Sequence, residues 1–271
     1  MEADKIFAKA ERIRNRFRLS DLWNKEEKYE KASHLYVKAG NKYKLNKLWS
    51  QAGNSFLKAA KCHEDSEKID HYVSAYKCLK RIDVNATIAC LQTIIKYYKD
   101  NGKYSLAARY LKELGEVDED HSLKWYHKAA EMYEIESQDS AMYQCYLKII
   151  PILLRKEEYD KALPLFNKIM KQCSDNNLLK FKLSEHLFYY VLCYLCLDDL
   201  VIARNRLIEY EICDHSREYQ FVSKLIDIIY DNNLEQFQIL VNNYDSISRI
   251  DEIGTKMLLN IKNKIGNLSL C

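Results

Sequence analysis

The chain has 271 residues but only six Gly and two Pro, which leaves few turn residues for a β-protein or flexible linkers and favours helices throughout. Its formal net charge of +3 is nearly neutral and argues against a nucleic-acid-binding protein, which would usually show a strong basic excess. The nine Cys are dispersed within helical patterns, which indicates reduced core thiols and an intracellular compartment.

The N-terminal residues mix acids and bases without an apolar core, so no signal peptide is expected. The longest nearly uncharged apolar run, Leu187–Leu197, is about half of the roughly 20 residues that a membrane span needs. The sequence therefore predicts a cytoplasmic protein that is soluble or at most peripherally associated with membranes.

Glu2–Arg16 has the apolar spacing of a first amphipathic helix. The short segment after it is unusually apolar and is flanked by arginine and lysine; its apolar residues are Phe17, Leu19, Leu22 and Trp23. Two interpretations stay open from the residues alone. The segment folds back on the next helices, or it touches a membrane, where aromatic side chains favour the lipid interface and cations favour anionic headgroups.

Tyr29–Ala60 predicts an antiparallel helical hairpin with a turn at Lys44–Leu48. Apolar residues recur every three or four positions in both halves, and large aromatic residues alternate with alanines. Neither helix is apolar enough to be buried alone, so further hairpins are expected to stack on this one.

The hairpin pattern continues along the chain. Large anchors follow one another at gaps of about 16–20 residues, close to half of the tetratricopeptide period; they are Tyr36, Phe56, Tyr72, Leu91, Tyr110, Tyr126, Tyr146 and Phe166. Turns are expected at Asn101–Gly102, Glu136–Ser140 and Lys156–Asp160, and Pro151 is expected to bend or locally break its helix.

The last third loses the alternation of alanine and aromatic residues. A long apolar helix is predicted at Leu178–Leu197, followed by helices at Leu200–Tyr210, Tyr219–Tyr230, Leu234–Asn242 and Thr255–Ile265, with a connection at Tyr244–Gly254. The predicted fold is all-α: a right-handed superhelical array of tetratricopeptide-like helical hairpins over residues 1–212, capped by a C-terminal helical bundle over residues 213–271.

Sequence motifs for catalysis or cofactor binding are missing. There is no P-loop, no H-E-x-x-H and no nucleophile elbow. Cys193 and Cys196 form a lone C-x-x-C without a second pair, and His121 and His127 do not share a helical face. We therefore expect no enzyme activity, no cofactor and no metal site, and instead a curved surface suited to binding a helix or peptide.

Three stretches resemble the soluble NSF attachment proteins, and the resemblance covers essentially the whole chain. They are Lys31–Ala60, the DHSRE at Asp214–Glu218, and YDSISRIDEIGTKMLLNIKNKI at Tyr244–Ile265. The last of these is the most specific and is similar to the alpha and beta types. The resemblance implies adaptors that wrap the four-helix SNARE bundle and recruit the hexameric ATPase NSF, which unwinds the bundle during vesicle trafficking and membrane fusion.

The resemblance also implies roles for individual residues. The basic residues Lys103, Arg109 and Lys148 and the apolar Leu178 match positions that contact the SNARE bundle. Two further basic positions of the family correspond here to Gln144 and Ser184, which should weaken the ionic part of the contact.

Phe17, Leu19, Leu22 and Trp23 take the place of an apolar loop that inserts into membranes in the family, which favours the membrane interpretation of this segment. For NSF binding, the matching positions are Asp198, Asp227, Asp231 and the penultimate Leu270. Tyr230 replaces one acidic residue of the family, and the tail GNLSLC replaces an acidic stretch. Of the activities that the resemblance implies, stimulation of the ATPase is therefore the one with the least support.

Two other functions remain as alternatives. The first is a tetratricopeptide-like scaffold for other helical or peptide partners, such as a chaperone adaptor. The second is a helical enzyme, which would need a cluster of strongly perturbed polar groups in a closed pocket.

Overall fold

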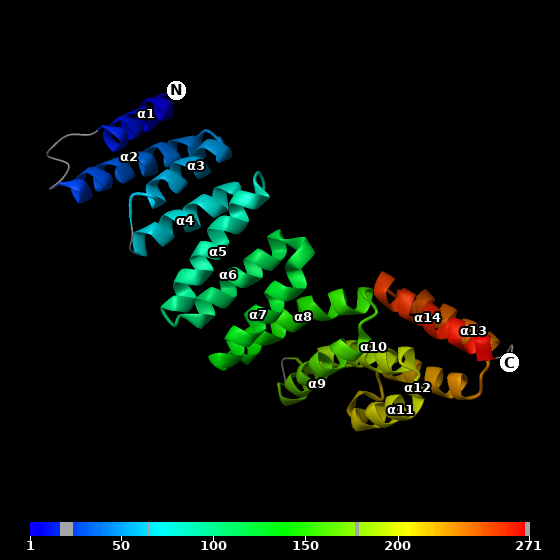
Figure 1. The fold of residues 1–271 in the computed structure, drawn as a ribbon. Helices are drawn as coiled ribbons and strands as arrows, with labels where there is room; N and C mark the ends of the chain where they lie inside the picture. Colours follow the sequence, from blue (N-terminus) through cyan, green and yellow to red (C-terminus); the bar gives the residue numbers. More distant parts are fainter. Residues whose placement is uncertain (17–23, 64–65, 177–178, 269–271) are drawn as a thin grey trace. The chain divides into compact units, whose positions relative to one another are not determined.

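The computed structural model describes residues 1–16, 24–63, 66–176 and 179–268. These residues form fourteen α-helices and short 3₁₀ helices at Glu119–His121, Lys180–Lys182 and Glu211–Cys213, without a strand among them (Figure 1). The prediction of an all-α chain built from consecutive helices is confirmed. None of the described helices is long and apolar enough to cross a membrane.

The chain divides into two compact units, Met1–Cys145 and Tyr146–Cys271. The predicted boundary between a hairpin array and a capping bundle at residues 212 and 213 stays a prediction.

The first unit is a series of helices in which, from α1 to α7, each packs against the next one along the chain. Its helices are α1 (Glu2–Asn15), α2 (Lys25–Leu45), α3 (Trp49–Ala60), α4 (Ser66–Leu79), α5 (Val84–Asp100), α6 (Tyr104–Val117), α7 (Ser122–Ile135) and the first turns of α8 (Asp139–Arg155). The predicted hairpin is therefore confirmed as α2 and α3. Its buried face combines Tyr36, Phe56 and fully buried alanines, as the alternation of large and small residues predicts.

Small residues allow close helix contacts in this unit. A Cβ atom at Gly53 on α3 would lie 2.5 Å from Cγ of Leu79 on α4, which is closer than two carbon atoms can approach. A Cβ at Gly40 on α2 would lie 3.0 Å from the ring of Phe56 on α3. These two glycines are thus required by packing, since their backbone conformation is ordinary helix.

Acidic residues of α1 attach this helix to α2. The Tyr36 hydroxyl donates a hydrogen bond to Oε1 of Glu11 at 2.8 Å, and the Tyr43 hydroxyl donates to Oδ1 of Asp4 at 2.7 Å. The two hydroxyls belong to buried rings, so each needs such a partner at the rim of the core. The α1 helix is consequently held by polar contacts along its length as well as by its apolar stripe.

The second unit is organised around α10 (Leu183–Cys196), which has eleven buried residues in its fourteen. This helix contacts α9 (Tyr159–Asp175), α11 (Leu200–Glu209), α12 (Arg217–Tyr230) and α14 (Glu252–Leu268), while α13 (Leu234–Ile247) packs against α12 and α14. A helix that is apolar all round must be covered on all sides, and its neighbours do so.

Three aromatic rings connect α10, α12 and α13. The ring centroids of Phe221 and Tyr244 are 4.4 Å apart, those of Phe188 and Phe221 are 5.6 Å apart, and those of Phe188 and Tyr244 are 5.9 Å apart. Each pair falls in the range of favourable aromatic contacts. We call Phe188, Phe221 and Tyr244 the aromatic triad.

Six turns between the described helices share one backbone geometry. After each of six helices, the N–H of a residue with positive φ donates a hydrogen bond to the carbonyl three residues before it. The N–H of the next residue donates to the carbonyl five residues before that residue. This is the Schellman motif, which satisfies the free carbonyls of a helix end. The positive-φ residues are Lys47, Gly102, Ser137, Glu157, Asp198 and Asn232.

Three sequence predictions need correction. The helix predicted at Leu178–Leu197 begins later, because the 3₁₀ helix Lys180–Lys182 precedes α10. The connection predicted at Tyr244–Gly254 is shorter, because Asp251 accepts a hydrogen bond from the Gly254 N–H and thereby starts α14 early. Pro151 does not break α8, which continues to Arg155 with its last apolar residues buried, whereas the expected bend at Pro151 stays a prediction.

Candidate binding surfaces

The residues predicted to bind partners are divided between the two units. Lys103 and Arg109 lie in the first unit, and Lys148 lies in the second with Asp198, Asp227 and Asp231. The remaining predicted residues lie outside the described part of the chain; they are Phe17, Leu19, Leu22, Trp23, Leu178 and Leu270.

Lys103 is exposed and occupies the N-cap position of α6. The N-terminal end of a helix carries partial positive charge, so a cation there is unfavourable by a few tenths of a kcal/mol to about 1 kcal/mol. The first turn of α6 contains no acidic residue of its own. The Glu136 carboxylate accepts hydrogen bonds from the N–H and hydroxyl of Ser105 in this turn, so it offsets part of the positive charge of the helix end.

Arg109 is exposed on α6 beside a group of tyrosines. The rings of Tyr98 and Tyr110 are stacked with centroids 5.7 Å apart, and Tyr76 meets Tyr110 edge-on at 6.0 Å. Burial raises the pKa of the Tyr110 hydroxyl, and the positive charge of Arg109 partly opposes this shift. A cation next to half-buried aromatic rings is suited to contact both acidic and apolar groups of a partner.

Lys148 is exposed on α8, and Gln144 lies one helical turn before it on the same face. Like Lys103 and Arg109, Lys148 makes no ion pair with the residues that the structure describes. Ser184 is half-exposed in the first turn of α10. Gln144, where the resemblance predicts a missing cation, thus lies one turn from the exposed cation Lys148.

The three predicted acidic residues all lie at C-terminal helix ends. Asp198 follows α10 in its Schellman turn, Asp227 is in the last turn of α12, and Asp231 is the C-cap of α12. Neither helix has a basic residue in its own last turn. Carboxylates add to the partial negative charge of these helix ends, which disfavours folding slightly and makes both ends attractive to a cationic partner.

Two of these carboxylates are held by ion pairs within the second unit. Nζ of Lys264 lies 2.7 Å from Oδ2 of Asp198, and Nη2 of Arg204 lies 2.7 Å from Oδ1 of Asp227. The carboxylates are largely exposed, so each pair contributes only about 0–1 kcal/mol and can exchange for a cation of a partner. The guanidinium of Arg204 also lies 6.0 Å from the ring centroid of Tyr230, the residue predicted to replace a further acidic position.

Lysines of α14 attach this helix to two of the helix ends. Lys264 donates to the Cys196 carbonyl at 2.5 Å as well as to Asp198. Lys256 repeats this arrangement, since it donates to the Arg155 carbonyl at 3.1 Å and lies 2.7 Å from Oε1 of Glu157. Neither lysine could be found from the sequence, because both are far along the chain from the groups they bind and no spacing indicates the contact.

Asp198 allows a test of its backbone conformation apart from its charge. Both Asp198→Gly and Asp198→Ala remove the carboxylate, but only Gly adopts the φ of 62° without a steric cost. We expect the Gly variant to be more stable than the Ala variant by about 1 kcal/mol in urea unfolding. Equal stabilities would show that the left-handed conformation is not retained.

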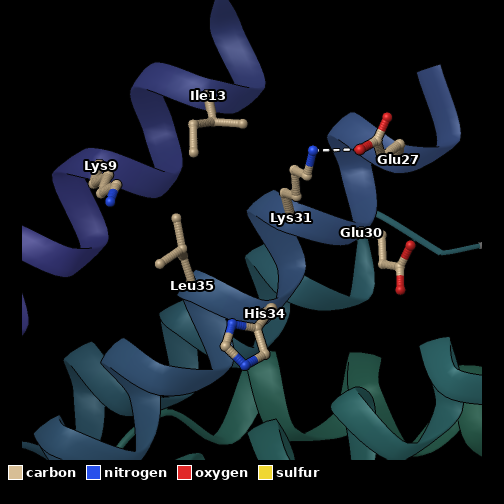
Figure 2. A pocket seen from close by; sticks show the side chains of 7 residues that line it. All are labelled: Lys9, Ile13, Glu27, Glu30, Lys31, His34 and Leu35. Carbon is tan, nitrogen blue, oxygen red and sulfur yellow. Dashed lines mark hydrogen bonds and ion pairs between the residues drawn. The ribbon is translucent and has the colours of Figure 1, made fainter. Parts of the chain in front are cut away.

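A groove between α1 and α2 has a volume of about 530 Å³ and is shown in Figure 2. Ile13 and Leu35 face each other across it, and Lys31 forms an ion pair with Glu27 at its edge. Its lining is completed by Lys9, Glu30 and His34. The groove combines an apolar centre with charged sides, which suits an apolar side chain of a partner better than a reaction.

The eight described cysteines are free, and six of them are buried. Burial raises the pKa of Cys193 well above its usual value and raises the pKa of Cys196 to about 12, so both thiols of the C-x-x-C stay protonated at neutral pH. A thiol binds a metal or reacts as its thiolate, so this pair is part of the core.

Comparison with known proteins gives one consistent result. The family profile described as "Soluble NSF attachment protein, SNAP" matches residues 1–266. The chain is 31% identical over 280 residues to the alpha-soluble NSF attachment protein of Mus musculus, which covers 97% of this chain and 95% of that protein. It is 32% identical over 261 residues to the beta-soluble NSF attachment protein of Bos taurus, with 91% and 87% covered. It is 30% identical over 254 residues to the vesicular-fusion protein SEC17 of Komagataella phaffii, with 88% and 86% covered.

Proposed function

The chain belongs to the soluble NSF attachment protein family, and from this membership we propose that it is an adaptor which binds assembled SNARE complexes at membranes and recruits the ATPase NSF. NSF then separates the SNARE helices during vesicle trafficking and membrane fusion. The observation that carries the proposal is the family match over residues 1–266. It is supported by an alignment with the Mus musculus relative that covers nearly the full length of both chains. In this role ATP is hydrolysed by NSF, so the chain itself needs no catalytic residues.

The cationic residues support the SNARE side of the proposal. Lys103 lies at a helix N-terminus, where its charge does not favour folding, and Arg109 and Lys148 are exposed without an ion pair among the described residues. Charges that do not stabilise the folded chain are available to an acidic partner. Such charges contribute mainly to the association rate and to the salt dependence of binding.

The acidic helix ends support the NSF side. Asp198, Asp227 and Asp231 each add charge to a helix end that is already negative. A cationic surface of the partner would relieve this repulsion and replace Lys264 or Arg204 in the existing ion pairs. We therefore propose that NSF contacts the ends of α10 and α12.

The connection between α1 and α2 supports contact with a membrane. Its two ends are joined by a hydrogen bond from Nζ of Lys28 to the Arg16 carbonyl at 2.5 Å, and exposed basic residues lie on both sides of it. Cations at these ends would meet anionic headgroups if the apolar residues between them entered a bilayer.

The double variant Phe17→Ser with Trp23→Ser is expected to reduce liposome-stimulated SNARE disassembly at least about 10-fold, because two large apolar side chains no longer enter the lipid. Binding to a soluble SNARE bundle should be unchanged. Trp49→Ser, at an exposed tryptophan that starts α3, is the matched control and should retain both activities. If the double variant lost soluble SNARE binding to the same extent, the segment would be structural.

The proposed function is tested by binding and disassembly with purified components. NSF in ATPγS is captured on the immobilised protein with and without an assembled SNARE bundle, and disassembly is then followed after addition of ATP and Mg²⁺. We expect NSF capture that increases with the SNARE bundle, and disassembly that requires this chain. Capture of neither partner would contradict the proposal. It would favour the alternative function, a scaffold for other helical or peptide partners. Capture without disassembly would show that the chain recruits NSF but does not support SNARE separation, which would contradict the disassembly part of the proposal.

A further inference from the structure

Three potential metal ligands meet where α3 connects to α4. His63 lies just after α3, and Glu67 and His71 lie one turn apart on α4. Each residue offers one ligand atom, and these three atoms all lie within 4.8 Å of one another. The cluster is unrelated to the cationic and acidic surfaces described above.

A buried serine orients the two imidazoles. Oγ of Ser33 on α2 lies 2.7 Å from Nε2 of His63 and 3.3 Å from Nε2 of His71, and the two ring centroids are 5.3 Å apart. The other ring nitrogen of His63, Nδ1, points to Glu67, whose Oε2 is 3.5 Å away. Metal-binding histidines characteristically hold their second nitrogen in such a hydrogen bond, which fixes the ring and its tautomer.

From this geometry we propose that His63, Glu67 and His71 bind Zn²⁺, with Ser33 as the hydrogen-bonding support of His63. Two imidazole nitrogens and one carboxylate oxygen form a ligand set that zinc accepts, with a fourth position left to water. Ligand atoms at about 2 Å from a tetrahedral metal lie about 3.3 Å apart, so the His63–Glu67 pair is already near that distance.

The remaining adjustment falls on an exposed side chain. The side chain of Glu67 is 63% exposed, so it can rotate toward the imidazoles without disturbing the core. An open cavity of about 770 Å³, lined in part by His63 and Glu67, gives the ion and its water ligand access from solvent. Glu26 and Glu30 also line this cavity and partly balance the charge of Lys25 and Lys61.

Bound zinc would connect three parts of the first unit. The ligands come from α4 and from the residue that follows α3, and their support comes from α2. The ion would therefore stabilise the folded state relative to the unfolded chain, in which these groups are not held together. This inference does not depend on the proposed adaptor role.

No metal site was expected from the sequence, because the cysteines and histidines do not form a complete set with a known metal-binding spacing. The three ligands do recur every four residues, at 63, 67 and 71, which is a helical spacing. The contribution of Ser33, 30 residues before His63, is visible only in the structure.

The test uses the full chain without a histidine tag. Zn²⁺ binding is measured by titration calorimetry, and Co²⁺ replaces Zn²⁺ to report the coordination geometry by its visible absorption. We expect one equivalent of metal and the intense Co²⁺ bands of a four-coordinate site. Glu67→Gln and His71→Ala should each lower the affinity at least about 10-fold, and Ser33→Ala should lower it about 10-fold through the imidazole it holds.

The control is His215→Ala, at a histidine that is almost fully exposed and lies in the second unit, and it should leave the affinity unchanged. Glu67→Gln keeps the test decisive even if a histidine variant folds poorly, because its side chain is exposed. The proposal is overturned if the chain binds no metal at 100-fold molar excess, if Glu67→Gln binds as well as the unchanged chain, or if His215→Ala loses binding to the same extent.

Discussion

Phe221→Ala is expected to lower the free energy of unfolding of the second unit by about 3–5 kcal/mol. The Phe221 side chain is 2% exposed and lies at the centre of the aromatic triad, 4.4 Å from Tyr244 and 5.6 Å from Phe188 between ring centroids. Its removal leaves a cavity where α10, α12 and α13 meet. Urea unfolding followed by circular dichroism measures the change, with the transition of each unit fitted separately.

The matched control is Tyr230→Ala on the same helix. Tyr230 is 74% exposed, so its removal should change the free energy of unfolding by no more than about 0.5 kcal/mol. A loss of stability that is equal in the two variants would show that the triad does not anchor α12. Since α12 carries Asp227 and Asp231, we also expect Phe221→Ala to reduce NSF recruitment at temperatures where the second unit is partly unfolded.

The second large effect is expected from Arg109→Glu combined with Lys148→Glu. Both side chains are exposed, and reversing two charges converts attraction to the acidic SNARE surface into repulsion. We expect the affinity for the assembled SNARE bundle to fall about 10- to 100-fold at low salt and by less at 0.5 M salt, where charges are screened. Binding isotherms at the two salt concentrations measure this difference.

The control for the charge reversal is Lys96→Glu with Lys171→Glu. These two lysines are exposed on α5 and α9. The control therefore changes the net charge by the same amount as Arg109→Glu with Lys148→Glu, and it also places one substitution in each unit. The control should bind SNARE complexes with nearly unchanged affinity. If both double variants bind equally, only net charge matters and the assignment of Arg109 and Lys148 is wrong.

The hairpin array could be predicted because its determinants are local. In α2 and α3, for example, Ala32, Tyr36 and Phe56 already show which face is buried, since a helix brings residues three and four apart together. The turns were also predicted from polar breaks in the pattern. The left-handed conformation at Glu157 or Ser137 was not, since side chains of this type give no indication of positive φ.

The candidate sites could be predicted only in part. The positions of Lys103, Arg109 and Asp198 came from the family resemblance, and nothing in their spacing distinguishes them from other surface charges. The contacts of Asp198 with Lys264 and of Ser33 with His63 join residues that are 66 and 30 positions apart. Such pairs depend on how the helices pack, which a single sequence does not specify.

Cys196 at the end of α10 can report movement of α14, because two residues of α14 contact it. Sγ of Cys196 donates a weak hydrogen bond to the Met257 carbonyl at 3.6 Å, and Lys264 binds the carbonyl of the same cysteine. Detachment of α14 from α10 would break both contacts and expose this sulfur to a thiol reagent, so the rate of chemical modification at Cys196 sets an upper limit on how often that helix detaches. The chain thus contains its own reporter for movement of the segment that carries the C-terminal tail.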